Sequence, residues 1–426
     1  MRRFWIIFFV SCVVSGFIFP VSFTFLPMSL STKMILGVIG VGLWGMKGIN
    51  AHRMEMSRPV VISGILAIIF SLWCLYSITA NGTHDTSYVT YFTSFALWLG
   101  GAYGVCALIR HYFDKVDLPL VTAILALVCV FQCVIALMID NIPFVDRFVN
   151  SIFWQAKDYY QRDNRLYGIG AALDPAGVRF SVVLAMIAHQ LSSNEDVLRD
   201  KRAQTTYTIA FIIIVVVGSM ISRTTMVGTA LGLGYILVWR FRLRRGGFIS
   251  RAQVGFAVLL VALITLFAVI GVVMYNSSPA ARGYLRFGFE GFFNWVETGE
   301  FRTGSTDILK NKMWIWPTDT RGWLIGYGRY GVMEWGSDVG YCLFTLYCGL
   351  IGLGIFSIFF IYNHLVLNKR FKNFFIMSLL LIAITFIVWR KVATDIFFID
   401  ALLFCMDGDK DEYEEDDDDE DLIDTE

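Results

Sequence analysis

Long runs of apolar residues, separated by short polar segments, recur along the whole chain. Runs of roughly 17 to 25 apolar residues cross about 30 Å of hydrocarbon as helices that satisfy their own backbone hydrogen bonds. We therefore predict an all-α, polytopic membrane helix bundle with about twelve transmembrane helices. The predicted spans are residues 4–19, 34–51, 59–79, 90–108, 119–139, 177–191, 206–221, 224–239, 253–275, 339–362, 374–390 and 395–406.

Two long segments, residues 140–176 and 276–338, interrupt this pattern. Both are rich in aromatic residues, which are typical of segments that pack or lie at a membrane interface rather than of disordered chain. We expect short amphipathic helices there that rest on the outer leaflet and roof a cavity. Loops of this length are usually functional, so we look for the chemistry of the protein in them.

Composition also points to a membrane protein. The chain is 56% hydrophobic and 16% charged, and its mean hydropathy of +0.62 excludes an ordinary soluble domain. All eight cysteines fall in apolar segments without a C-x-x-C pair, so we expect neither a disulfide framework nor a zinc site. Residues 1–406 are predicted to form one transmembrane domain that begins with an uncleaved first helix.

The formal net charge of zero hides an acidic C-terminal tail. Residues 407–426 hold 14 of the 35 acidic residues and one of the 35 basic residues, and we predict a disordered cytoplasmic tail. Lys and Arg of the remaining chain concentrate in alternate loops. This pattern places both termini in the cytoplasm and the two long loops on the outer, periplasmic face of a cell inner membrane. Arg390 and Lys391, between the last two spans, depart from it.

Arg223 lies in the turn Ser222-Arg223-Thr224-Thr225 between two apolar helices. A guanidinium in such a place is costly unless it is paired or lines a wet cavity. The alternative is a side chain that simply extends to the membrane interface, but so short a turn leaves little room for that. We favour a catalytic role for Arg223.

The first long loop ends in a cluster of charged and turn-forming residues around Arg165, Asp174 and Arg179. A structural salt bridge is one interpretation of this cluster. Arginine is also suited to bidentate phosphate recognition, so these three are candidate substrate-binding residues. Both interpretations stay open for Arg165, whereas binding is favoured for Arg179 because it lies closer to the membrane.

The second long loop supplies further candidates. Arg302 and Asp338 are the strongest for catalysis. Weaker candidates for substrate binding lie in this loop or directly after it: Arg286, Arg329 and Tyr341. For Arg286 and Arg329, as for Glu334, a surface salt bridge is the favoured alternative.

No arrangement of residues indicates metal or nucleophilic catalysis, and no cofactor is expected. None of the five histidines stands beside a carboxylate pair in the long loops. Guanidinium groups and a few carboxylates on the outer side of the membrane domain are suited to binding an anionic lipid headgroup. Fixed arginines stabilise a departing lipid diphosphate, and a carboxylate such as Asp338 can accept the proton of an attacking hydroxyl.

From about residue 60 to residue 400 the chain resembles the Wzy-type O-antigen polymerases and, more widely, the superfamily that they share with the O-antigen ligases. The resemblance rests on the turn at Ser222-Arg223-Thr224-Thr225, the large outer loop, Leu324-Ile325-Gly326-Tyr327-Gly328 within that loop, and Ser337-Asp338-Val339-Gly340-Tyr341 at its end. It implies a glycosyltransferase that moves a growing polysaccharide from undecaprenyl diphosphate onto a new lipid-linked repeat unit of O-antigen, the polymer of lipopolysaccharide, or of capsule. The arginines that bind donor diphosphate and glycan in the family match Arg223, Arg179 and Arg302 by motif context.

Three other functions stay open. The ligase branch, which transfers finished polymer to lipid A core, carries a histidine where this chain has Ser337-Asp338; this difference favours the polymerase and leaves its general base open. Twelve spans would be consistent with a lipid-linked sugar transporter, or flippase. Transporters usually have ionisable residues or broken helices near the midplane of the membrane, however, and these spans are almost free of charge. A non-catalytic assembly partner is the third possibility. Expected partners are the lipid bilayer, the undecaprenyl-diphosphate-linked oligosaccharide, a chain-length regulator and a flippase, and no nucleic acid is expected.

Overall fold

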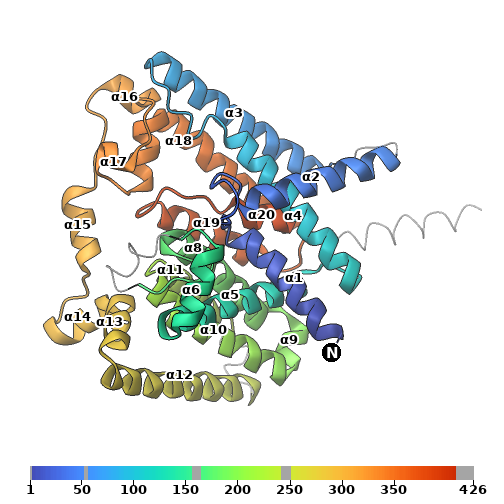
Figure 1. The fold of residues 1–426 in the computed structure, drawn as a ribbon, viewed down its shortest axis with the longest axis vertical. Coiled ribbons are helices and arrows are strands. Elements are labelled where there is room, and N and C mark those ends of the chain that lie inside the picture. The colour runs from blue at the N-terminus through green and yellow to red at the C-terminus, as the bar shows by residue number, and fades with distance from the viewer. Residues whose placement is uncertain (1, 52–55, 156–164, 241–250, 409–426) are drawn as a thin grey trace, which may run out of the picture. The chain divides into compact units, whose positions relative to one another are not determined.

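The computed structural model describes residues 2–51, 56–155, 165–240 and 251–408. The regular structure of this part of the chain is helical, and two isolated β-bridges are the other pairing within it. It forms two compact units that we describe one at a time (Figure 1): residues 1–32 with 122–307, and residues 33–121 with 308–426. Of the predicted acidic tail, only Asp407 and Gly408 lie among the described residues.

Every predicted span contains a helix. Within the described residues, seven helices are long and apolar enough to cross a membrane: α2 (Thr32–Asn50), α3 (Arg58–Ala80), α4 (Tyr91–Phe113), α5 (Leu118–Asn141), α10 (Lys201–Ile221), α12 (Arg251–Ser277) and α18 (Gly340–Val366). The other predicted spans coincide with α1 (Arg2–Ile18), α8 (Leu173–Ser193), α11 (Thr225–Tyr235) with the π-helical turn Ile236–Arg240, α19 (Phe375–Val388) and α20 (Phe397–Cys405). The all-helical class is confirmed, whereas twelve crossings and the sides of the loops stay predictions.

Short helices occur in the described parts of both long loops. The first loop contains α6 (Pro143–Ile152), and the second contains α13 (Pro279–Gly288), α14 (Glu290–Thr298), α15 (Gly304–Lys312), α16 (Thr320–Ile325) and α17 (Val332–Trp335). α6 and α13 both begin with proline, whose fixed φ and missing N–H suit the first position of a helix. Their predicted place on the outer leaflet stays a prediction.

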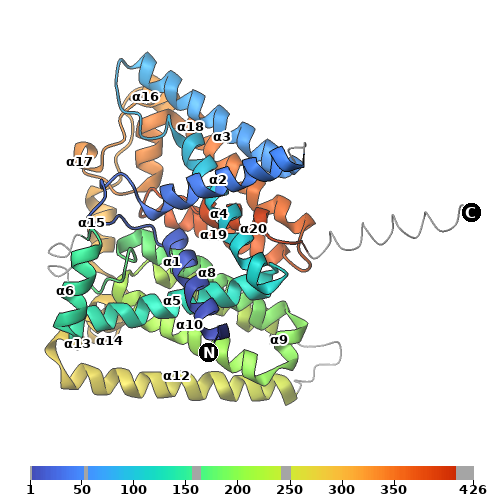
Figure 2. The ribbon, with the colours of Figure 1, turned by 45° about the vertical axis from the view of Figure 1, so that its right-hand side comes forward.

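Helix α8 forms the core of the first unit. Of its 21 residues, 16 are buried, because it packs against both α10 and α11 (Figure 1). α11 comes so close that a Cβ on Gly228 would lie 2.2 Å from the Cα of Ser181. Only glycine permits this approach, so Gly228 fixes the position of α11 and of the turn before it. Figure 2 shows α12 running alongside α10 in the same unit.

Helix α18 of the second unit is broken. Gly349 has φ 68° and ψ −178°, and the chain folds back there. The ring centroids of Phe344 and Phe356 are 5.2 Å apart, although a straight helix would separate their Cα atoms by about 18 Å. A Cβ on Gly349 would lie 2.2 Å from the carbonyl oxygen of Leu324. The predicted tenth span is therefore two helical arms that meet at Gly349.

A buried polar pair lies where α18, α19 and α20 meet. His364 Nδ1 is 2.8 Å from Asp400 Oδ1, and His364 Nε2 is 3.2 Å from Thr385 Oγ1. The side chains of His364 and Asp400 are both fully buried. The spans are predicted to be almost free of charge, and this buried pair departs from that prediction.

Candidate functional site

Arg223 lies in a turn that a carboxylate of α8 holds in place. α10 ends at Ile221, and Asp174 accepts hydrogen bonds from Ser222 Oγ at 3.1 Å and from Thr224 Oγ1 at 2.6 Å. The dipole of α8 also favours a carboxylate in its first turn. Asp174, predicted to bind substrate, therefore fixes the backbone on both sides of Arg223.

The guanidinium of Arg223 meets residues of the second long loop. It forms an ion pair with Glu290, donates a hydrogen bond to Ser305 Oγ at 2.7 Å, and lies over the ring of Phe287 with Cζ 4.5 Å from the ring centroid. Glu290 in turn accepts the backbone N–H of Gly304 at 2.9 Å. The side chain of Arg223 is only 17% exposed, so it does not extend freely to solvent.

Arg165 shares the aromatic neighbour of Arg223. Its Cζ lies 4.8 Å from the centroid of the Phe287 ring, a position that the ring quadrupole favours for a cation. The next residue, Leu166, donates its backbone N–H to the carbonyl of Met220 at 3.2 Å and so ties this segment to the end of α10. The structure thus brings together two arginines that the sequence places 58 positions apart.

Two guanidinium groups so close to each other are electrostatically costly. Burial lowers the pKa of Arg223, and the positive charge of Arg165 lowers it further, whereas Glu290 and Asp174 raise it. The carboxylates thus offset part of the cost of keeping charge in a partly desolvated place. Two guanidinium groups and two carboxylates therefore act on one another in this part of the unit.

Arg179 and Arg286 of the same unit are engaged in other ways. Arg179 is half-buried, and its Nη1 donates to the carbonyl of Pro175, one turn earlier on α8, at 2.7 Å. Arg286 forms a half-exposed ion pair with Glu297 and lies 5.4 Å from the ring of Phe293. The salt bridge considered as the alternative for Arg286 is present, and ligand binding by either arginine stays a prediction.

Arg302 lies close in sequence to Ser305, the partner of Arg223, but its own guanidinium pairs with carboxylates. It is 2.9 Å from Glu300 and 3.3 Å from Asp307, and its side chain is 58% exposed. The hydrogen bond from Arg302 to Glu300 raises the pKa of the guanidinium, and the charges of Asp307 and Glu300 add to this effect. Its predicted catalytic role stays a prediction.

The remaining predicted residues belong to the second unit. Arg329 pairs with Glu334 at 2.6 Å, which is the exposed salt bridge considered as the alternative. Tyr341 donates its hydroxyl to the carbonyl of Phe386 at 2.8 Å, and Asp338 is exposed just before α18. Substrate binding by Arg329 and Tyr341, and base catalysis by Asp338, stay predictions.

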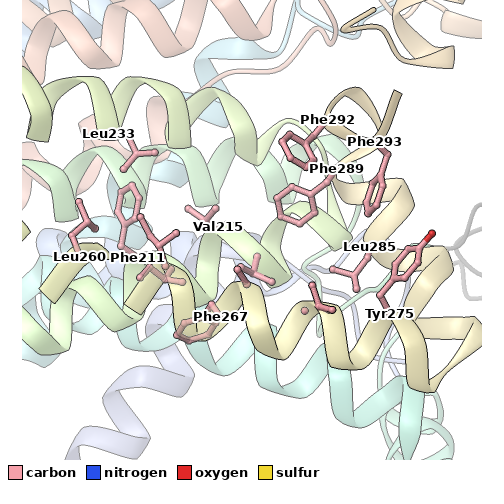
Figure 3. A pocket seen from close by; sticks show the side chains of 16 residues that line it. Phe211, Val215, Leu233, Leu260, Phe267, Tyr275, Leu285, Phe289, Phe292 and Phe293 are labelled. Carbon is pink, nitrogen blue, oxygen red and sulfur yellow. The ribbon is translucent and has the colours of Figure 1, made fainter. Parts of the chain in front are cut away.

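An apolar cavity of about 440 Å³ adjoins the arginine cluster. Side chains of α10, α11, α12, α13 and α14 line it, together with Phe289, which lies between α13 and α14. Its aromatic lining residues are Phe211, Phe267, Tyr275, Phe289, Phe292 and Phe293. Figure 3 shows Phe289, Phe292 and Phe293 together at one end and Phe211, Leu233 and Leu260 at the other. Because Phe289 lines the cavity and the next residue, Glu290, pairs with Arg223, the aromatic end lies beside the arginines.

Sequence reasoning missed Phe287, Glu290 and Ser305 as parts of the site. They come from short helices that are themselves amphipathic, but the pattern of each helix does not show which distant residues its faces meet. A single carboxylate among aromatic residues, in Phe287-Gly288-Phe289-Glu290, is the one signal that could have marked the segment.

Comparisons of the chain with protein-family models, with curated proteins and with solved structures find no match. Among the described residues, no three His, Cys, Asp or Glu side chains are grouped so as to hold a metal ion. The site is therefore interpreted from its own chemistry. It consists of two guanidinium groups on one aromatic ring, a carboxylate and a hydroxyl, beside an apolar cavity.

Proposed function

We propose that the chain is a multi-pass membrane glycosyltransferase that polymerises saccharide repeat units carried on undecaprenyl diphosphate. The observation that carries the proposal is the position of Arg223 and Arg165 on the ring of Phe287, beside an apolar cavity of about 440 Å³. A ligand that fits both features has an anionic head and a long apolar tail. A lipid-linked sugar diphosphate has both.

The arginine cluster suits the diphosphate. Guanidinium groups bind phosphate oxygens through two parallel hydrogen bonds, and stacking on Phe287 holds both groups in place before the ligand arrives. Donors fixed in advance stabilise a developing charge without reorganisation at the moment of reaction. Glu290 keeps Arg223 paired while the site is free, and the diphosphate takes the place of this carboxylate.

The cavity suits the lipid tail. Its volume falls within the range of about 300 to 1,000 Å³ found for small-molecule sites. A polyprenyl chain gains little hydrophobic free energy when it moves from lipid into a protein groove, because the lipid is equally apolar. We therefore assign the cavity a role in alignment, since it directs the diphosphate towards the arginines.

In the proposed reaction, a hydroxyl of the acceptor repeat unit attacks the anomeric carbon of the donor sugar. The bond from that carbon to the diphosphate oxygen breaks, and Arg223 and Arg165 stabilise the charge of the departing undecaprenyl diphosphate. Attack from the face opposite the leaving group inverts the anomeric configuration. The proton of the hydroxyl passes to a base.

The proposal includes the predicted topology. Twelve spans, cytoplasmic termini and outward-facing long loops place the arginine cluster on the periplasmic side of a cell inner membrane. The concentration of Lys and Arg in alternate loops supports this orientation. The resemblance to Wzy-type O-antigen polymerases leads to the same reaction on O-antigen or capsule.

A lipid-linked sugar transporter is the second candidate, and one pair of observations favours it. α18 is broken at Gly349, and His364 and Asp400 are paired in a fully buried place. Broken helices and buried ionisable residues mark transport pathways in many membrane proteins. Loss of a transporter would leave repeat units on the inner face of the membrane, whereas loss of a polymerase would leave single units at the cell surface.

Complementation of a strain that lacks the gene tests the proposal. Wild type, Arg223→Ala and the control Arg147→Ala are compared on silver-stained gels of surface polysaccharide; Arg147 is an exposed arginine of α6 that bonds the Pro143 carbonyl. We expect a full ladder from wild type and the control, and single-repeat glycan from Arg223→Ala. A full ladder from Arg223→Ala would contradict the site, and long polymer trapped on its lipid carrier would indicate a ligase.

A further inference from the structure

Arg165 also lines a second cavity of the first unit, and this one is polar. Its volume is about 130 Å³, and it lies between the end of α5, α6, residues 165–167 and α13. The polar side chains of its wall are Asp140, Asp146, Arg165, Tyr167 and Tyr284. A space of this size holds several water molecules, and hence the hydroxyl groups along one edge of a sugar ring.

The two carboxylates of this cavity differ in their surroundings. Asp146 Oδ1 accepts hydrogen bonds from Tyr167 Oη at 3.1 Å and from Asn150 Nδ2 at 2.7 Å, so it is part of the local framework. Asp140 Oδ1 accepts the hydroxyl of Tyr284 at 2.5 Å, whereas its Oδ2 has a long contact of 3.4 Å with the neighbouring Asn141 amide. Asp140 is also exposed, which leaves Oδ2 accessible to a ligand.

Tyr284 donates a hydrogen bond to Asp140 and so holds the carboxylate in place. Burial raises the pKa of Tyr284, and its bond to Asp140 raises the pKa further, so the phenol keeps its proton. One carboxylate oxygen is thus oriented by the protein, and Asp140 itself lines the cavity. An acceptor hydroxyl needs this arrangement if it is to give up its proton to a carboxylate in a fixed position.

The polar cavity and the arginine cluster share Arg165. Tyr284 and Phe287 are three residues apart on α13, so their side chains lie on the same face of that helix. Arg165 lines the cavity and also lies over Phe287, which Arg223 shares. A ligand in the cavity therefore lies next to the place that the lipid diphosphate is proposed to occupy.

We propose that this cavity binds the terminal sugar of the acceptor repeat unit and that Asp140 is the catalytic base. This inference rests on the proposed function and names the acceptor subsite of the same site. The acceptor hydroxyl loses its proton to Asp140 Oδ2 as its oxygen forms the bond to the anomeric carbon. The electron pair of the broken bond leaves with the diphosphate beside Arg165 and Arg223, and Asp140 then releases its proton to water.

The full chain in lipid nanodiscs tests the assignment, with lipid-linked repeat units extracted from the gene-deletion strain as substrate. Asp140→Asn is compared with wild type and with Glu195→Gln, a control that removes an exposed carboxylate on α9 (Glu195–Arg199). We expect Asp140→Asn to lower kcat by about 100-fold or more, as for loss of a general base. Stabilisation by undecaprenyl diphosphate in a thermal shift assay should stay at the wild-type value, and Asp140→Glu should recover part of the rate.

Each outcome of this experiment is decisive. Polymerisation by Asp140→Asn at the wild-type rate overturns the assignment of the base but leaves the proposed function standing. Absence of polymer from wild type overturns the proposed function itself. If Asp140→Asn does not fold, Tyr284→Phe tests the assignment instead. This variant keeps the carboxylate of Asp140 and removes only the hydrogen bond from Tyr284 that orients it. A lower kcat with an unchanged thermal midpoint supports the proposal, and an unchanged kcat overturns it.

Discussion

Arg223 and Arg165 hold their guanidinium groups over the same ring, that of Phe287, with Cζ atoms 4.5 and 4.8 Å from its centroid. One arginine comes from the turn between α10 and α11 and the other from the first long loop. Their mutual repulsion is offset in part by Glu290, which pairs with Arg223. The protein thus keeps two guanidinium groups in a partly buried setting, and the predictions below depend on this arrangement.

Removal of the counter-ion should lower the stability of the ligand-free protein and increase the stabilisation that an anionic lipid provides. Glu290→Gln leaves Arg223 without its carboxylate, so we expect the free energy of unfolding to fall by about 1–3 kcal/mol. Undecaprenyl diphosphate should then raise the thermal midpoint more than it does in wild type. The control is Glu297→Gln, which removes a half-exposed pair with Arg286 and should change stability little. An equal response of Glu290→Gln and wild type to the lipid would contradict the shared site.

The stacking of Arg165 should matter as well as its charge. Arg165→Lys keeps the positive charge but loses the planar fork and much of the contact with Phe287. We expect the affinity for undecaprenyl diphosphate to fall about tenfold, or about 1.4 kcal/mol. Binding to protein in nanodiscs measures this, with Arg147→Lys as the control. Equal affinity for Arg165→Lys and wild type would show that charge alone suffices.

Filling the apolar cavity should discriminate between lipid tails. Val215 lines the cavity (Figure 3), whereas Val258 on α12 is 63% exposed and is not among the lining residues. Val215→Trp should weaken binding of undecaprenyl diphosphate, and inorganic diphosphate, which has no tail, should bind as it does to wild type. Val258→Trp is the matched control. Weaker binding of both ligands to Val215→Trp would mean that the substitution disturbs the arginines instead.

The break in α18 depends on one glycine. Gly349→Ala places a Cβ in a residue with φ 68° and 2.2 Å from the Leu324 carbonyl oxygen, so we expect a loss of at least about 2–3 kcal/mol in stability. Gly354→Ala, in the same helix with nothing within 4 Å of the added Cβ, should be neutral or stabilising by up to about 1 kcal/mol. Yields and thermal midpoints in detergent compare the two. Equal stability of both variants would contradict the broken helix.

The hydropathy pattern predicts where the helices lie, because a run of neighbouring apolar residues is enough to identify each one. The same pattern predicts α18 as one span, since the residues on both sides of Gly349 are equally apolar and the glycines Gly349, Gly352 and Gly354 do not by themselves show which one breaks the helix. Arg223 can also be recognised from the sequence as a candidate site residue, because a guanidinium between two apolar helices is unusual whatever the rest of the fold.

Partners distant in sequence could not be predicted in this way. Glu290 lies 67 residues after Arg223, and the amphipathic pattern of its short helix does not show which distant side chain that helix meets. Asp140 begins the first predicted long loop and is not marked by any motif, and only the position of α13 brings Tyr284 to it. Asp338 was chosen as a base from its place in a motif, whereas the carboxylate that shares a cavity with Arg165 comes from the end of α5.

The most direct test of the central claim is the length of the glycan made by the purified full chain in liposomes that contain only lipid-linked repeat units. The account predicts a ladder that grows by whole repeat units, with one undecaprenyl diphosphate released for each bond formed, and no ladder from Arg223→Ala. Repeat units that cross the bilayer without becoming longer would contradict the account and would instead support a transporter built around the buried His364 and Asp400.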